Sequence, residues 1–249
     1  PAYHDYWLRD MEHAFSEEAF LLIPPAADAD RPYLLFPGCQ LAASDARYPG
    51  TAWHLLRRAY AGSGLLLACC GAPARWAGDI ELHQEALDRL SEAWEQAGQP
   101  ILVCACPTCI KQLRAALPQM EIISLYQALA ESNTLDLPAV DNGESLALCD
   151  PCAAKEEPRL RADVSALLDR MRVQHHCITE DMRELPCCGF GGNIEGACPE
   201  LSEMMAEQRI QAAAASETLY HGHSITPFKL RKVERSRSSN ASTSEPVFL

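Results

Sequence analysis

Short apolar runs alternate with longer helical segments through the first half of the chain. Almost wholly apolar runs are typical of strands in a parallel sheet that is covered on both faces. They occupy Tyr33–Phe36, Gly64–Ala68, Ile101–Cys104 and Met120–Ser124. The predicted helices between them are Thr51–Ala61, Asp79–Ala97 and Cys106–Leu117. In the longest helix, Leu87, Leu90 and Trp94 fall on one stripe, as on a buried helix face.

The same rhythm returns in the second half, with a strand at Ser145–Leu148 and helices at Pro158–Met171 and Leu201–Ala215. We therefore expect an α/β fold of two pseudo-repeated units, each a small parallel sheet flanked by helices. The expected divisions are a lead-in segment (1–30), a first unit (31–132), a linker (133–144), a second unit (145–228) and a tail (229–249). Because the tail is basic and then rich in Ser, we predict that it is disordered.

The chain has twelve cysteines, and six of them recur in the same order in the two halves. The first half contains Pro37-Gly38-Cys39, Cys69-Cys70-Gly71 and Cys106-Pro107-Thr108-Cys109. The second half contains Asp150-Pro151-Cys152 and Cys187-Cys188-Gly189. The lone cysteine precedes the pair by 30 positions in the first half and by 35 in the second. The cysteines therefore follow the same repeat as the strands and helices.

Each cysteine group stands where a predicted strand ends. The carboxyl ends of parallel strands meet at one edge of a sheet, so the groups of the first unit should converge there. Soft thiolates select zinc, copper(I) or iron–sulfur sites. Structural zinc usually takes two Cys-x-x-Cys knuckles, whereas this unit has one, a vicinal pair and a lone cysteine. We favour an iron–sulfur cluster, with zinc as the alternative, on Cys39, Cys69, Cys70, Cys106 and Cys109.

The second unit offers an incomplete copy of this site. Its candidate ligands are Cys152, Cys187 and Cys188. A Cys-x-x-Cys is expected near position 224 by the spacing of the first unit, but the sequence there has no cysteine. Cys149 stands three positions before Cys152 and is a substitute ligand in one interpretation and a core strand residue in the other, which we favour.

Charge and motifs exclude several classes of function. The net charge of −13 argues against nucleic acid or an anionic membrane surface as the main partner. No apolar stretch of about 18 residues predicts a membrane span, and no secretory signal is visible. A phosphate-binding Gly-rich motif is also absent from the sequence, so NAD or ATP binding is not expected. We expect a cytoplasmic protein, which a partner subunit can bring to a membrane.

The five cysteines and their spacing resemble the cysteine-rich CCG domain, which occurs in the catalytic subunit of heterodisulfide reductase and in the iron–sulfur subunit of anaerobic glycerol-3-phosphate dehydrogenase. The resemblance implies a [4Fe-4S] cluster of the non-cubane kind on the first unit. Heterodisulfide reductase cleaves its disulfide between two such clusters. Because the second unit lacks its last pair, one cluster is expected and a second is doubtful.

The resemblance also implies a function. The chain would be an oxidoreductase subunit that passes electrons from a flavoprotein or ferredoxin-like partner to a disulfide or quinone-type acceptor. A thiol or disulfide would then be the substrate. Two alternatives stay open, namely an electron-relay module without its own substrate, and a zinc-bound or metal-free scaffold.

Overall fold

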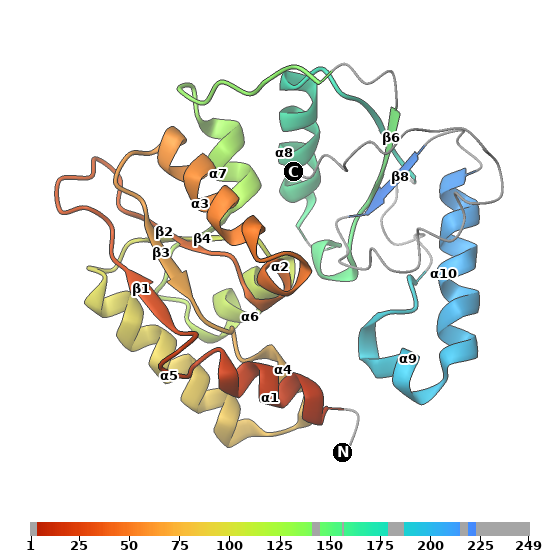
Figure 1. Cartoon of the computed structure of the whole chain (residues 1–249), viewed down its shortest axis with the longest axis horizontal. Coiled ribbons are helices and arrows are strands. Elements are labelled where there is room, and N and C mark those ends of the chain that lie inside the picture. The colour runs from red at the N-terminus through yellow and green to blue at the C-terminus, as the bar shows by residue number, and fades with distance from the viewer. Residues whose placement is uncertain (1–3, 141–144, 156, 179–186, 215–218, 223–249) are drawn as a thin grey trace.

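The computed structural model of the chain describes residues 4–140, 145–155, 157–178, 187–214 and 219–222 (Figure 1). The first unit is built on a five-stranded sheet with the order β1-β3-β2-β4-β5. Its strands are β1 (Leu21–Ile23), β2 (Tyr33–Phe36), β3 (Gly64–Leu67), β4 (Ile101–Cys104) and β5 (Ile122–Ser124). The pairings among β2 to β5 are parallel, as predicted. The edge strand β1 pairs antiparallel with β3, so the lead-in segment contributes to the sheet.

Helices cover both faces of this sheet, because the side chains of each strand alternate between the faces. Leu34 and Phe36 of β2 face one core, and Tyr33 and Leu35 face the other. The first core is closed by α1 (Asp5–His13), α5 (Ile80–Gln96) and α6 (Pro107–Ala116), and the second by α3 (Arg47–Ala59) and α7 (Leu125–Glu131). Two short helices, α2 (Cys39–Ser44) and α4 (Ala72–Ala77), follow β2 and β3. The predicted α/β arrangement, a small parallel sheet flanked by helices, is confirmed.

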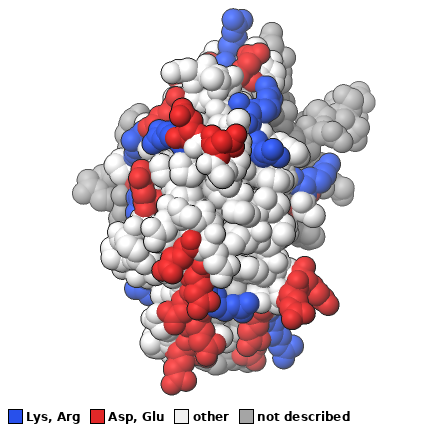
Figure 2. Space-filling model, turned by 90° about the vertical axis from the view of Figure 1, so that its left-hand side faces the viewer, with Lys and Arg blue, Asp and Glu red and all other residues white. Residues whose placement is uncertain are grey.

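Helix α5 shows how the sequence sets one of these elements. The carboxylate of Asp79 caps the helix by accepting the Leu82 N–H at 3.0 Å. Its buried face comprises Ala86, Leu87, Leu90, Ala93 and Trp94. The outer face carries exposed acidic residues, namely Glu81, Glu85, Asp88, Glu92 and Glu95. Figure 2 shows acidic side chains gathered over the lower part of this side of the molecule.

The second unit repeats the topology of the first. Its strands are β6 (Ser145–Cys149), β7 (Gln174–Cys177) and β8 (Leu219–Gly222), all parallel and in the order β7-β6-β8. This order matches β3-β2-β4, so β6 corresponds to β2, β7 to β3 and β8 to β4. Its helices are α8 (Pro158–Arg170), α9 (Ile194–Ala197) and α10 (Pro199–Ala214), with 3-10 turns η1 (Cys152–Ala154) and η2 (Gly191–Asn193). The predicted pseudo-repeat is therefore present in the fold.

The two units pack against each other through α7 and α8. Leu167 of α8 is buried in the core beneath α3 and α7, and the next residue, Leu168, lies in the second unit's own core. Arg170 donates hydrogen bonds to the carbonyls of Leu129 at 3.0 Å and Leu135 at 2.5 Å. Helix α8 thus contributes side chains to both units.

Several sequence expectations fall outside the described ranges. They include the end of the linker at 141–144, the end of the second unit at 223–228 and the tail at 229–249. Within the described ranges, no helix has both the length and the apolar character that crossing a membrane requires.

Leu167→Ala is expected to weaken the coupling between the units as well as the core. A buried Leu→Ala change costs about 2–5 kcal/mol of unfolding free energy. Calorimetry of the variant should resolve two unfolding steps. The matched control is Leu168→Ala, with similar burial in the same helix, which should lower the stability of the second unit alone. A single, cooperative transition in Leu167→Ala, at the midpoint of Leu168→Ala, would contradict this view of the interface.

Candidate metal centre

Three loops at one edge of the first sheet bring the five predicted thiols together. Cys39 begins α2, three positions after β2 ends, and the Cys69-Cys70 pair follows β3. Cys106 caps the N-terminus of α6, and Cys109 lies in its first turn. Because β2, β3 and β4 are parallel, their carboxyl ends share this edge. The convergence expected from the sequence is what the structure shows.

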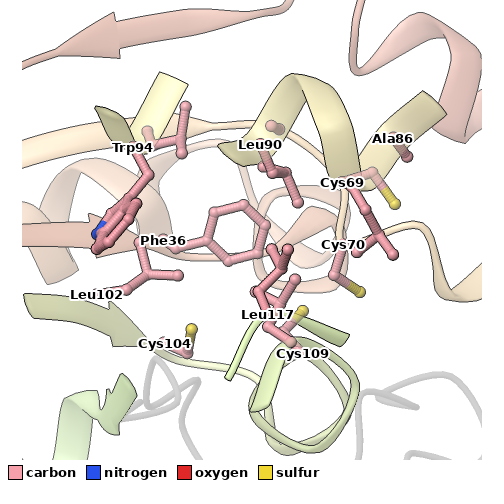
Figure 3. Packing of buried hydrophobic residues seen from close by; sticks show 14 of the residues in the cluster. Phe36, Cys69, Cys70, Ala86, Leu90, Trp94, Leu102, Cys104, Cys109 and Leu117 are labelled. Carbon is pink, nitrogen blue, oxygen red and sulfur yellow. The ribbon is translucent and has the colours of Figure 1, made fainter. Parts of the chain in front are cut away.

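The five sulfurs contact one another in series. The Cys39 thiol donates a hydrogen bond to Cys69, and Cys69 donates to Cys70. The Cys109 thiol lies between Cys70 and Cys106 and can donate its single proton to either sulfur. Cys69, Cys70 and Cys109 are buried, whereas Cys39 and Cys106, at the two ends of the series, are half-buried. Figure 3 shows the sulfurs of Cys70 and Cys109 near each other at the end of the apolar core.

These contacts shift the thiol pKa values in opposite directions. The hydrogen bonds from Cys109 and Cys69 lower the pKa of Cys70 to about 5. The Cys109 thiol, helped by the N–H groups of Cys109 and Thr108, lowers the pKa of Cys106 to about 6. The hydrogen bonds that they donate, together with burial, raise the pKa values of Cys39 and Cys109 well above the ordinary range. Two of the five sulfurs are therefore poised as thiolates, the form that binds metals.

Opposing effects act on the pKa of Cys69, the second thiol of the series. The hydrogen bond from Cys39 lowers its pKa, but the bond that it donates to Cys70 and its burial outweigh this and raise the pKa to about 12. The N–H of Gly71 also donates to the Cys69 sulfur. An equivalent bond exists in the second unit, where the Gly189 N–H lies 3.5 Å from the Cys187 sulfur. Backbone N–H groups thus reach the first sulfur of the cysteine pair in both units.

Glycine is required where the backbone passes closest to the sulfurs. Gly38 has a φ of +76°, and a Cβ at this position would lie 3.0 Å from the Cys109 sulfur. An L-residue is strained at such a φ, and its side chain would enter the space between the loops. The glycine before Cys39 therefore lets two cysteine loops approach.

Cys104 lies near these thiols but outside the series. It is the last residue of β4 and is fully buried, and burial raises its pKa well above the ordinary range. In Figure 3 its sulfur lies apart from those of Cys70 and Cys109. This placement makes Cys104 a residue of the apolar core.

In the second unit, the strand equivalence distinguishes Cys152 from Cys149. Cys152 lies three positions after β6, as Cys39 lies three positions after β2. Cys149 is the last residue of β6 and corresponds to Phe36, a core residue. Cys149 is fully buried, and its sulfur accepts a hydrogen bond from Arg209 Nε at 2.7 Å. The ligand interpretation of Cys149 stays a hypothesis, but the strand position supports the core interpretation.

Arg209 joins Cys149 to the loop that carries Cys152. The residue is 2 % exposed, and its guanidinium also donates to the Asp150 carbonyl at 2.7 Å. The Asp150 carboxylate accepts a hydrogen bond from Arg161 Nε at 2.6 Å. Two arginines from α8 and α10 therefore hold the Asp150-Pro151-Cys152 loop.

The thiols of the second unit are more open than those of the first. Cys152 and Cys187 are exposed, and Cys188 is half-buried. In the part of the chain that the structure describes, no hydrogen bond links Cys152 to either cysteine of the pair. The position that corresponds to Cys106, two residues after β4, is Ser224 after β8, which lies outside the described residues.

The N-terminal helix contacts the loop after the second cysteine pair, which the sequence did not indicate. The Trp7 indole N–H of α1 donates to the Asn193 side chain at 3.1 Å. Its ring also packs edge-on against Phe190, with centroids 6.4 Å apart. Trp7 and Asn193 are 186 positions apart, and no periodicity or motif relates them. The lead-in segment therefore touches both units.

A small cavity lies where the two units meet beside their cysteine loops. Its volume is about 30 Å³, and its walls include Pro107 and Tyr126 from the first unit and Asp150 and Pro151 from the second. Pro107 is adjacent to Cys106 and Pro151 to Cys152, so these cysteine loops face the same interface. Burial, with a contribution from Cys106, raises the pKa of Tyr126 to about 12.

The donor set fits a multi-metal group. Five sulfurs in series, each within reach of the next, can bind different corners of an iron–sulfur cluster, and thiolates are the usual ligands of such clusters. Among the described residues, no three or more His, Cys, Asp or Glu side chains converge on a point where one metal ion could bind, so the five sulfurs do not form a mononuclear site. The chain thus supplies two things that such a group needs. Its five thiols lie in series, and Gly38 keeps the space beside the Cys109 sulfur open.

Comparison with known proteins identifies two matched regions. The cysteine-rich CCG domain family matches residues 33–114 and 146–221, more than half of the chain. A similar protein is one of the subunits of the fumarate reductase (CoM/CoB) of Methanothermobacter marburgensis, 20 % identical over 147 residues. That alignment covers 57 % of this chain and 29 % of the relative, so the chain spans less than a third of the relative's length.

Arg209→Met is expected to lower the free energy of unfolding by about 1–3 kcal/mol, because buried hydrogen bonds from a charged donor are lost. Urea-induced unfolding measures the change. Gln208→Met, at the neighbouring exposed position of α10, is the matched control and should leave stability almost unchanged. Equal stability of the two variants would show that the guanidinium does not support this loop.

Proposed function

Because the chain belongs to the cysteine-rich CCG domain family, we propose that it is an iron–sulfur redox subunit. It passes electrons from a flavoprotein or ferredoxin-like partner to a disulfide or quinone-type acceptor. The observation that carries this proposal is the series of five thiols at one sheet edge, from Cys39 through Cys70 to Cys106.

The first unit would hold a [4Fe-4S] cluster, which supplies one-electron transfer when bound. Cys39, Cys69, Cys70, Cys106 and Cys109 provide one thiol more than the four that a cubane takes. The lowered pKa values of Cys70 and Cys106 favour these two as the first ligands to lose their protons. The fifth sulfur supports a non-cubane arrangement.

A disulfide acceptor requires two electrons and two protons to become two thiols. The loops of Cys106 and Cys152 face one interface between the units, and its cavity of about 30 Å³ has to open before a disulfide can enter. A disulfide cut between two clusters would also need Cys152, Cys187 and Cys188 to bind metal.

The exposure of the cysteines in the second unit favours one alternative function, an electron relay without its own substrate. Cys152 and Cys187 are exposed. Within the described ranges they are not hydrogen-bonded to each other, so what is described of this unit does not repeat the thiol series of the first. In that case the first unit would exchange electrons with partner proteins alone.

A partner subunit is part of the proposal. The similar protein is called a subunit of a reductase, and this chain spans only part of it. We propose that the electron donor is a separate flavoprotein or ferredoxin-like protein. We also propose a cytoplasmic location, since cytosolic thiols are kept reduced.

Anaerobic reconstitution tests the cluster directly. The chain should bind about four iron and four sulfide, as one [4Fe-4S] cluster requires, and turn brown. Cys70→Ala should lose the visible absorbance, because Cys70 stands in the centre of the series. The matched control is Cys104→Ala, a nearby buried cysteine outside the series, which should stay brown. Equal absorbance in the two variants would refute the ligand assignment, and a colourless chain with one zinc would refute the redox function.

The acceptor is tested with the reconstituted chain and a chemical electron donor. Thiol release from a mixed disulfide supports the reductase. Reoxidation by a quinone analogue without thiol release supports a quinone-type acceptor. Reduction of the cluster without turnover of either compound supports the relay.

A further inference from the structure

The carbonyl of Gly71, directly after the first cysteine pair, is held by His83 of α5. The Nδ1 atom of His83 lies 3.0 Å from the Gly71 oxygen, which also accepts the backbone N–H of Arg75 at the longer distance of 3.3 Å. A carbonyl oxygen has no proton to donate, so Nδ1 carries the hydrogen and is the donor. Gly71 has a φ of +76°, and a Cβ there would lie 2.8 Å from the same Nδ1. The turn is therefore closed against His83, with no space for a side chain.

The second cysteine pair has the same arrangement with a different side chain. The Ser202 hydroxyl of α10 donates to the Gly189 carbonyl at 2.6 Å. Gly189 also has a φ of +76°, and a Cβ there would clash with the Ser202 carbonyl oxygen. Ser202 is 1 % exposed, so water does not compete for this bond.

The two donors occupy equivalent places in the repeat. Helix α5 lies between the cysteine pair and β4, and α10 lies between the pair and β8. His83 is the fourth residue of α5, and Ser202 is the fourth residue of α10. One helix position therefore supplies the donor in both units, although the residue type differs.

We propose that His83 and Ser202 are equivalent positioning residues. Each holds the turn of a Cys-Cys-Gly segment in its ligand-presenting conformation by fixing the glycine carbonyl. Both bonds are made to the glycine and not to a cysteine sulfur, so each residue acts through the glycine. Because the second unit also has a hydrogen bond from this helix position to the glycine carbonyl, its cysteine pair is held in the same way as the first.

Holding the glycine carbonyl also affects the hydrogen bond that the glycine N–H makes to a cysteine sulfur. Fixing Gly71 also fixes its N–H, which donates to Cys69, and fixing Gly189 fixes the N–H that donates to Cys187. Hydrogen bonds to ligand sulfurs contribute to the reduction potential of iron–sulfur sites. This last step rests on the proposed function, whereas the positioning of the turns does not.

The first experiment uses the full-length chain without metal. Amide hydrogen exchange over residues 69–72 is compared in His83→Asn and His83→Leu. The two side chains have the same branched shape, but only Asn has a donor near the place of Nδ1. Loss of one neutral hydrogen bond should make exchange about three- to ten-fold faster in His83→Leu, and His83→Asn should stay close to wild type. His54→Leu, at an exposed position of α3, is the control.

The second experiment applies the same comparison to the other unit. Exchange over residues 187–190 should rise in Ser202→Ala and stay close to wild type in Ser202→Thr, which keeps the hydroxyl. Ser165→Ala, at a half-buried position of α8, is the control. Circular dichroism confirms that each variant is folded, and this pair decides the proposal if a His83 variant does not fold.

Wild-type exchange in both His83→Leu and Ser202→Ala would overturn the proposal. Equal acceleration in His83→Asn and His83→Leu would also overturn it for the first unit, because packing rather than a donor would then matter. In the reconstituted chain, His83→Leu should lower the midpoint potential at unchanged iron content, and His83→Asn should restore it. An unchanged potential would overturn the link to the cluster. A chain that binds no iron would refute the proposed function and leave the exchange result intact.

Discussion

Parallel strands that end at one edge of a sheet are the constraint on which the first unit depends. Strands β2, β3 and β4 cross the sheet in the same direction, so each of them delivers a cysteine group to the same edge. Helices on both faces are needed to make these crossings, and they bury the strands between two cores. The burial that stabilises the sheet also removes Cys69, Cys70 and Cys109 from water. Their protons are then distributed by thiol–thiol hydrogen bonds.

The second unit keeps this scaffold and changes the side chains in it. In the first unit, Phe36 at the end of β2 and Leu90 of α5 belong to one apolar core. Cys149 ends β6 as Phe36 ends β2, and Arg209 is the eleventh residue of α10 as Leu90 is of α5. These two counterparts form a buried polar contact. A buried guanidinium needs its hydrogen-bond partners, so this contact fixes α10 against β6. The two units therefore share a backbone arrangement but have different side chains in their cores.

The relation between the two units is decided by segments outside the cysteine motifs. Helix α8 carries Leu167 into the first unit's core, and α1 carries Trp7 to the loop after the second cysteine pair. Both contacts tie one unit to the other, and they restrain the interface that Pro107 and Pro151 line. The lead-in segment thus has a structural role in both units.

The sequence by itself determined the strands β2, β3, β4, β5 and β6, the principal helices, the repeat and the five thiols of the first unit. Apolar periodicity and cysteine spacing are local signals, and they place these elements to within a few residues. Only the tertiary structure decided that Leu21–Ile23 joins the sheet, and that the half-buried strand Gln174–Cys177, with its two histidines, forms β7. It also decided the partners of Trp7, His83, Ser202 and Arg209. Each of these side chains meets its partner across 12 to 186 positions, because packing brings the elements together, and no local pattern records such a contact. The series of thiols was predictable as a group, but the order of its hydrogen bonds follows from burial and distance alone.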